Sequence, residues 1–210
     1  MLRLLAIVVT LAVAACRSAS GDAPMVVQPG APGEPSRVVT GSAATETPQP
    51  LHTAADVRFM QEMIGHHAQA LEMTELLKTR STSEDMHKLA LRIELSQRDE
   101  IQMMQEWLRS RGAAVPDEHA HHAHDAKLMP GMLTKEEMAR LAAAKGVAFD
   151  RLFLEFMIKH HQGALIMVRD LFATPGAGQE VEISAFASDV DADQLIEIRR
   201  MGIMLKELQK

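Results

Sequence analysis

The sequence predicts an all-α protein whose folded part is a ferritin-like four-helix bundle, made of two duplicated helical hairpins joined by a long crossover. Two observations predict this fold class: the kinds of apolar residue present, and a repeat of one helical segment. Of the 210 residues, 47% are apolar, with 15 Met but only 6 Phe, 1 Trp and no Tyr. All-β domains depend on β-branched and aromatic side chains, so this composition favours helices.

The repeat relates the two halves of the chain. Residues 56–73 align with residues 150–167 at a shift of 94, and nine of the 18 aligned residues are identical. A weaker match follows at a shift of 97, further along each half. Each half therefore contains two helical segments, which we expect to fold as an antiparallel hairpin. The two repeats span about residues 53–112 and 147–210.

The N-terminus resembles an export signal. Arg3 precedes the apolar run from Leu4 to Ala14, which is too short for a membrane span of ~20 residues. The junction Val13-Ala14-Ala15-Cys16 is similar to a bacterial lipobox, in which the cysteine carries the lipid and becomes the first residue. We therefore expect a lipoprotein signal peptide over residues 1–15 and lipidation of Cys16. The alternative is an ordinary signal peptide with an incidental cysteine.

The following segment, residues 16–51, is rich in Pro, Gly, Ser, Ala and Thr and shows no helical or strand period. We expect a flexible linker there and the bundle domain over residues 52–210. The protein is then exported and lipid-anchored in the bacterial envelope, with its domain in the periplasm or at the cell surface. Since Cys16 is the only cysteine, any soft-metal chemistry of the domain falls to Met and His.

Cap signals divide the first half of the domain into two helices. Thr53-x-x-Asp56 opens the first helix, which we expect to end near Thr79. Ser81-x-x-Glu84 resembles a capping box and opens the second helix, which we expect to end near Arg111. The first half is therefore predicted to be one long hairpin.

The second half follows a loop over residues 113–133. Thr134-x-x-Glu137 opens a short helix that we expect to end at Gly146. A third long helix is predicted from about Val147 to Ala173. After a turn over residues 174–178, a fourth helix is predicted to run to the C-terminus.

On a helical wheel, the first long helix has one broad apolar face that contains two adjacent histidines. Gly65, Ala68 and Gln69 are expected to lie largely outside this face. The repeat places the equivalent residues of the third helix in the same way. The histidines and methionines predicted on these two faces are His66, His67, Met63, Met73, His160, His161, Met157 and Met167.

The second and fourth helices carry polar residues on faces that should be buried. Gln97 and Glu100 share one face with large apolar side chains, and Gln194 and Glu197 are their equivalents in the repeat. A buried carboxylate is unfavourable unless it is paired or bound to a metal. We therefore expect Glu100 and Glu197 to orient the histidines, to balance their charge, or to ligate a metal directly.

These residue types favour copper. Thioether sulfur is soft and imidazole is intermediate, so the combination suits Cu(I), with Cu(II) acceptable to the histidines and another transition metal as the alternative. The competing interpretation is core packing, which we favour for Met60, Met104 and Met201. The loop is a second candidate region because His-rich composition is typical of metal binding. Its histidines are His119, His121, His122 and His124.

An iron site is less well supported. Ferritin-like di-iron sites use a Glu-x-x-His motif on two helices. Glu84-x-x-His87 has this spacing, but the repeat contains no counterpart. The pattern therefore does not favour a di-iron centre.

The motif Met63-Ile-x-His66-His67-x-x-Ala70-x-x-Met73 resembles the signature of the bacterial domain of unknown function 305 family. So do Met129-Pro-Gly-Met132 and the second motif, Met157-Ile-x-His160-His161, in that order. The resemblance extends over roughly residues 52–210. It implies a ferritin-like, exported protein linked to copper handling, with His and Met as ligands, and it adds Met129 and Met132 to the candidates. Leu154 replaces the repeat's Met60, so the two halves are not chemically equal.

Three functions remain open from the sequence. The first is a copper-binding envelope lipoprotein for metal homeostasis or resistance, with copper-handling envelope proteins as partners. The second is a ferritin-like metal oxidase or di-metal enzyme that uses Glu100 and Glu197, and the third is a metal-free structural or interaction bundle. We favour a binding protein over an enzyme and expect no catalytic residues. The net charge of −6 and the lack of a basic patch argue against nucleic acid as a partner.

Overall fold

The computed structural model describes residues 26–28, 36–39, 51–117 and 128–208. The chain divides into two compact units, Met1–Pro48 and Gln49–Lys210. In the first unit, β1 (Val26–Gln28) pairs antiparallel with β2 (Arg37–Val39), and Val27 lies opposite Val38. This short hairpin was not expected, because three-residue strands are too short to show a period, although Val favours a strand.

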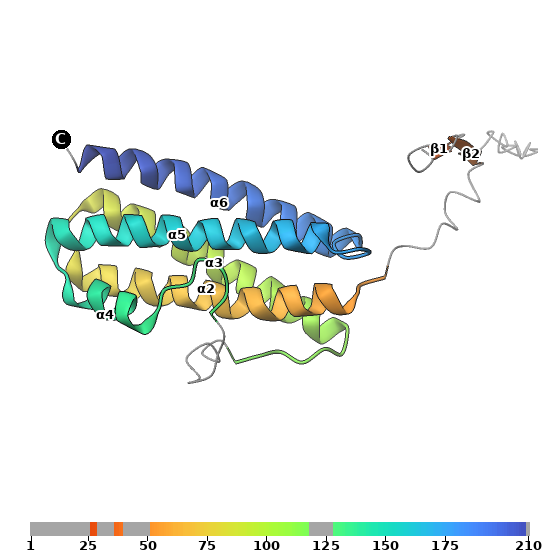
Figure 1. The fold of residues 1–210 in the computed structure, drawn as a ribbon, viewed down its shortest axis with the longest axis horizontal. Coiled ribbons are helices and arrows are strands. Elements are labelled where there is room, and N and C mark those ends of the chain that lie inside the picture. The colour runs from red at the N-terminus through yellow and green to blue at the C-terminus, as the bar shows by residue number, and fades with distance from the viewer. Residues whose placement is uncertain (1–25, 29–35, 40–50, 118–127, 209–210) are drawn as a thin grey trace, which may run out of the picture. The chain divides into compact units, whose positions relative to one another are not determined.

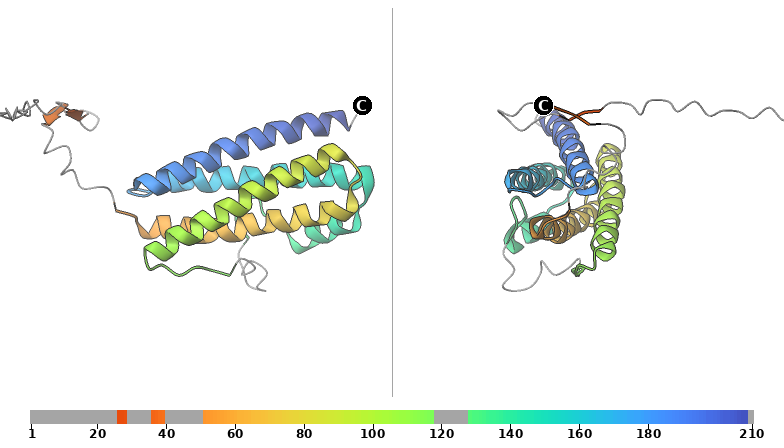
Figure 2. Two further views of the ribbon diagram at one scale, coloured as in Figure 1. Left: turned by 180° about the vertical axis from the view of Figure 1, so that it is seen from behind. Right: turned by 90° about the vertical axis from the view of Figure 1, so that its right-hand side faces the viewer.

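The second unit is an all-α four-helix bundle of ferritin-like topology, as predicted (Figure 1). Its long helices form two antiparallel hairpins, α2 with α3 and α5 with α6, and α2 packs against α5 between them. The end view in Figure 2 shows the four long helices around a common core. The helices are α2 (Ala54–Arg80), α3 (Glu84–Ser110), α4 (Lys135–Ala143), α5 (Gly146–Ala173) and α6 (Val181–Glu207).

Side-chain caps determine where the helices begin. Thr53 and Asp56 form a capping box at the start of α2, and Thr134 forms another with Glu137 at the start of α4, as predicted. The start of α3 was predicted wrongly: Ser83, not Ser81, accepts the hydrogen bond from the Met86 amide.

Glycine has a different role from the predicted one at the end of α4. That helix ends at Ala143, and Gly146, with φ of +56°, is the first residue of α5 rather than the stop signal of the shorter helix. Glycine adopts this left-handed backbone conformation without steric penalty, so it serves the sharp change of direction between the two helices. At the end of α3, Gly112 has φ of +66° and follows the last helical residues as expected.

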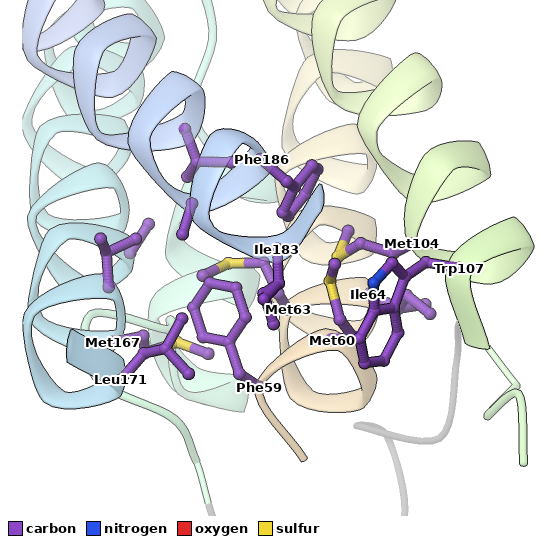
Figure 3. Packing of buried hydrophobic residues seen from close by; sticks show 14 of the residues in the cluster. Phe59, Met60, Met63, Ile64, Met104, Trp107, Met167, Leu171, Ile183 and Phe186 are labelled. Carbon is purple, nitrogen blue, oxygen red and sulfur yellow. The ribbon is translucent and has the colours of Figure 1, made fainter. Parts of the chain in front are cut away.

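The core consists of two apolar clusters, one toward each end of the bundle. The first joins the early part of α2 to the late part of α5, and Figure 3 shows its methionine, phenylalanine and tryptophan side chains. The second joins the late part of α2 to the early part of α5. Because α2 and α5 are antiparallel, their central residues lie between the clusters. None of the helices in the described residues is long and apolar enough to cross a membrane.

Candidate metal centre

Four histidines lie between the two apolar clusters, at the middle of α2 and α5. His66, His67, His160 and His161 are all fully buried, with 0% of each side chain accessible to solvent. The rings of His66 and His160, one from each helix, have centroids 3.9 Å apart and an interplanar angle of 38°. The structure therefore brings the two sequence-predicted histidine pairs together into one cluster.

His67 and His161 are each paired with a carboxylate from the other helix of their own hairpin. His67 Nε2 is 2.5 Å from Glu100 Oε2, and His161 Nε2 is 2.6 Å from Glu197 Oε2. Both glutamates are buried, so the residues that the wheel placed on buried faces of α3 and α6 do face histidines. Ser96 donates a further hydrogen bond to Glu100, at 3.1 Å.

The surroundings of the cluster lower the pKa of both Glu100 and His160. This favours the charged form of the glutamate and the neutral form of the histidine. Burial alone would raise the pKa of Glu100, but the hydrogen bond and charge of His67, with help from Ser96 and His161, hold it below its usual range. Burial lowers the pKa of His160 well below its usual value, and the neighbouring histidines lower it further. Glu100 is therefore held as a carboxylate, while His160 is held as a neutral imidazole.

Several ring nitrogens of the cluster remain unpaired among the described residues. They are Nδ1 of His67, Nδ1 of His161 and both ring nitrogens of His160, and all are buried. Buried polar atoms usually have a hydrogen-bond partner, so unpaired ones call for an explanation. A histidine that donates Nε2–H to a carboxylate presents the lone pair of Nδ1, which is the arrangement by which carboxylates orient metal-binding histidines.

The methionines of the motif lie on either side of the histidines. Met63 and Met167 belong to the first apolar cluster, while Met73 and Met157 belong to the second. All four are buried. The four thioethers of the motif therefore belong to the two apolar clusters on either side of the histidines.

The Met129–Met132 segment closes over the cluster. The Pro130 carbonyl lies 3.0 Å from His66 Nε2, which brings this part of the loop to the candidate site. Met132 is buried, whereas Met129 is partly buried against the first apolar cluster. This segment crosses α5 at Gly163, where a Cβ atom would lie only 1.9 Å from the Pro130 oxygen. Only glycine permits so close an approach.

Gln69 holds this segment in place and was missed by the sequence analysis. Its Nε2 donates to the Leu133 carbonyl at 3.0 Å, and its Oε1 accepts from the Leu133 amide at 2.7 Å. The wheel placed Gln69, Gly65 and Ala68 largely outside the apolar face, but all three are buried. The reason is that α2 is covered by α3, α5 and the loop with α4, so more than one face of it is internal.

The remaining candidates lie away from this cluster. His87 Nε2 contacts the Ser81 carbonyl at 3.0 Å at the beginning of α3, and Glu84 is exposed, so the Glu84-x-x-His87 motif does not reach the centre. The loop histidines His119, His121, His122 and His124 lie outside the described residues, as does Cys16. Within the described part of the chain, no three His, Cys, Asp or Glu side chains are already arranged to hold a metal ion. Metal binding at the cluster would therefore require rotation of side chains.

Comparison with known proteins identifies the family of this chain. The sequence matches the domain of unknown function 305 family (DUF305) over residues 56–205. The chain belongs to the DUF305 family. A DUF305 fragment from Deinococcus radiodurans is 33% identical with a TM-score of 0.63, and the alignment covers 75% of this chain and 99% of that structure. A DUF305 protein from Streptomyces coelicolor, named as secreted, is 30% identical with a TM-score of 0.63, covering 74% and 94%.

Other solved structures similar to this DUF305 chain are those of CopM. Its Cu(II)-bound form is 28% identical with a TM-score of 0.59, and its Cu(I)-bound form is 28% identical with a TM-score of 0.56. Both alignments cover 72% of this chain and 96% of CopM. A search of the curated proteins found no match. The family resemblance inferred from the motifs is therefore confirmed, and CopM, a protein of similar fold, has been solved with copper bound.

Proposed function

We propose that this DUF305 chain binds copper through its buried histidines and methionines and serves copper homeostasis or resistance in the bacterial envelope. The observation that carries the proposal is the central cluster, in which His67 and His161 turn Nε2 to a carboxylate and leave Nδ1 without a partner. CopM, a structure of similar fold, has been solved with Cu(I), Cu(II) and silver bound.

The donor set fits copper better than harder metals. The neutral imidazole of His160 and the neighbouring histidine rings, with thioethers in the apolar clusters on both sides, combine intermediate and soft donors, which favour Cu(I) and accept Cu(II). Glu100 and Glu197 each already contact a histidine, so we assign them an orienting role rather than direct ligation. This arrangement argues for cargo binding, with the ion held by side chains that rotate to receive it.

An acidic cleft offers a route to the cluster. A cavity of about 280 Å³ between α3 and α6 is lined by Asp99, Asp189 and Asp193, and it reaches Glu100. Burial and the negative charges of Glu100 and Glu197 raise the pKa of Asp193. A cleft with charge of one sign concentrates the oppositely charged ion, so we propose that copper enters here.

The location of the protein follows from the same proposal. The Streptomyces coelicolor relative is named as secreted, which supports export of this chain. We propose that Cys16 carries the lipid and that the segment up to residue 51 links the anchor to the domain. Such a linker would let the domain exchange copper with other envelope proteins.

A competition titration tests the proposal. The purified full chain is titrated anaerobically with Cu(I) against a chromophoric chelator, beside the variant His67→Gln/His161→Gln. We expect tight binding that weakens by about tenfold or more in the variant, since each substitution removes a donor nitrogen. His87→Gln, which removes a histidine outside the cluster, is the matched control and should bind as the parent does.

Three other outcomes of these titrations would contradict the proposal. Full binding by the double variant would move the site to the loop of residues 119–132, and no binding by the parent chain would leave the histidines as core residues. Dioxygen consumption on loading with Cu(I) would indicate an oxidase instead of a binding protein.

A further inference from the structure

The methionines of the first hairpin mark a second place where sulfur gathers, apart from the histidine cluster. Met60 and Met103 line an open groove of about 360 Å³ whose walls include Trp107 and Phe186. Met104 is buried in the same apolar cluster as Met60. Figure 3 shows the sulfur-bearing ends of Met60 and Met104 pointing toward one another beside the Trp107 ring.

Packing alone does not require sulfur at this place. In the second half of the chain, Leu154 occupies the position of Met60, and Arg200 occupies that of Met103. Leu154 is fully buried, so leucine fills the equivalent core position well. Met104 is matched by Met201 in the second half, so the thioethers that distinguish the first hairpin are those of Met60 and Met103.

The groove is open at one side and carries negative charge there. Met103 is 50% exposed, which makes one thioether directly accessible from solvent. Glu106 and Glu182 line the same groove. Arg111 lies 4.2 Å from the centre of the Trp107 ring, but its charge is balanced by ion pairs with Glu180 and Glu182. Because Glu182 is paired with Arg111, an incoming cation meets the Glu106 carboxylate at the mouth and sulfur inside.

We propose that Met60, Met103 and Met104 bind one soft monovalent cation, Cu(I) or Ag(I), beside Trp107. Thioethers are neutral, polarisable donors that select soft ions, while Mg²⁺ and Ca²⁺ require oxygen ligands. The site is separate from the histidine cluster and goes beyond the function proposed above. The chain would then have two sites: a thioether site that binds Cu(I), and the histidine cluster, which accepts both Cu(I) and Cu(II).

Trp107 makes the site observable, since it is the only tryptophan in the chain. Its indole orientation is fixed by a hydrogen bond from Nε1 to Glu180, at 3.0 Å. The purified full chain is titrated with Ag(I) in chloride-free buffer while tryptophan fluorescence is recorded. We expect a change in intensity that saturates with one bound ion.

The decisive variant is Met60→Leu/Met104→Leu. Met60→Leu recreates Leu154 of the second half, and Met104→Leu removes the adjacent buried thioether. Exchange of Met for Leu nearly conserves side-chain volume, so we expect the fold to persist, as far-UV circular dichroism can verify. The fluorescence response should weaken at least about tenfold in Ag(I) concentration because two soft donors are lost. Met103→Leu should weaken it as well. The matched control is Met201→Leu, a buried methionine of α6, which should leave the response unchanged.

Three results would overturn the proposal. They are an unchanged response in Met60→Leu/Met104→Leu, an equal loss in Met201→Leu, and binding of Ag(I) by mass spectrometry with no change in Trp107 fluorescence. All these variants keep the four central histidines. A failure here would therefore leave the copper proposal for the histidine cluster standing, and failure of that cluster would not abolish the Trp107 response.

Discussion

At the scale of single residues, the contact between histidine and glutamate organises the centre of the bundle. His67 and His161 are held by Glu100 and Glu197 at 2.5 and 2.6 Å, so the same pair occurs once in each hairpin. The carboxylate fixes which ring nitrogen carries the proton and how the ring is turned. The first prediction tests this orienting role.

Replacing Glu100 by glutamine should weaken Cu(I) binding by about 10- to 100-fold, because the amide keeps the shape of the side chain but loses its charge. Competition against a chelator measures the change. Glu94→Gln is a matched control on the same helix, where Glu94 forms an ion pair with Arg98 away from the cluster. Equal affinity in Glu100→Gln and the parent chain would show that the carboxylate does not orient a ligand.

The same residues predict acid sensitivity of the metal-free protein. The pKa of His160 is well below its usual value in the folded state, so the unfolded chain takes up this proton first as the pH falls below about 6.5. The lowered pKa of Glu100 adds stability at neutral pH that is lost as the pH falls below about 4.5 and through the folded value. The free energy of unfolding should therefore decrease from about pH 6.5 downward.

Urea unfolding at a series of pH values measures this dependence. His160→Gln should show a shallower decrease between about pH 6.5 and 5 than the parent chain, since it cannot take up the proton. His87→Gln, which leaves the buried cluster intact, serves as the control. A slope that stays the same in His160→Gln would contradict the assignment.

The sequence predicted the residues of the histidine cluster, but it did not predict the contact that holds the loop beside them. Periodicity and the repeat predicted both histidine pairs and the inward position of Glu100 and Glu197, because these depend on the face of one helix. Gln69 was missed because its role depends on a loop about 64 residues further along, where it bonds Leu133. No local pattern encodes such a contact.

At the scale of elements, the Met129–Met132 segment and α5 depend on each other. Gly163 lies against Pro130 so closely that any side chain would collide with the loop backbone. The segment in turn places the Pro130 carbonyl on His66. A change at Gly163 should therefore be felt at the candidate site as well as in stability.

Gly163→Ala should lower the free energy of unfolding by about 1–3 kcal/mol, because the added methyl group meets the backbone oxygen of Pro130 at 1.9 Å. Chemical denaturation measures the loss. Gly202→Ala is the matched control, since nothing lies within 4 Å of its Cβ position in α6 and alanine favours a helix by about 1 kcal/mol. If both variants stabilised the protein, the close approach of the loop would be refuted.

Element boundaries show where sequence signals suffice. The capping boxes at Thr53 and Thr134 were predicted because each needs only two side chains three residues apart. Ser81 and Ser83 offered two such starts within one turn, and the choice of Ser83 depends on where α2 ends, which is a matter of packing. The hairpin of Val26–Gln28 with Arg37–Val39 joins two segments too short to be recognised separately.

At the scale of the whole molecule, two hairpins enclose a polar centre, and an acidic cleft between α3 and α6 leads to it. The duplication made this architecture predictable, since equivalent helices carry equivalent motifs. The cleft was not predictable, because Asp99 comes from the first hairpin and Asp189 and Asp193 come from the second. Their approach is a consequence of the bundle and not of either repeat.

The variant Asp189→Asn/Asp193→Asn should slow the association of copper with the chain by about tenfold at low salt, because the field that draws cations into the cleft is weakened. Stopped-flow mixing measures the rate. The difference should shrink at about 1 M salt, where charges are screened over about 3 Å. Glu84→Gln/Asp85→Asn removes the same charge from the exposed start of α3, and an equal effect in it would rule out a specific route.

The most direct test of the central claim is an NMR titration of the chain, labelled with ¹⁵N in its histidine rings, with Ag(I), a diamagnetic substitute for Cu(I). The account predicts that the ring-nitrogen signals of His67, His160 and His161 shift as the first ions bind, with the change located at Nδ1 of His67 and His161. If only the loop histidines His119–His124 shifted, while the buried rings kept their metal-free signals, the central cluster would not be the metal centre.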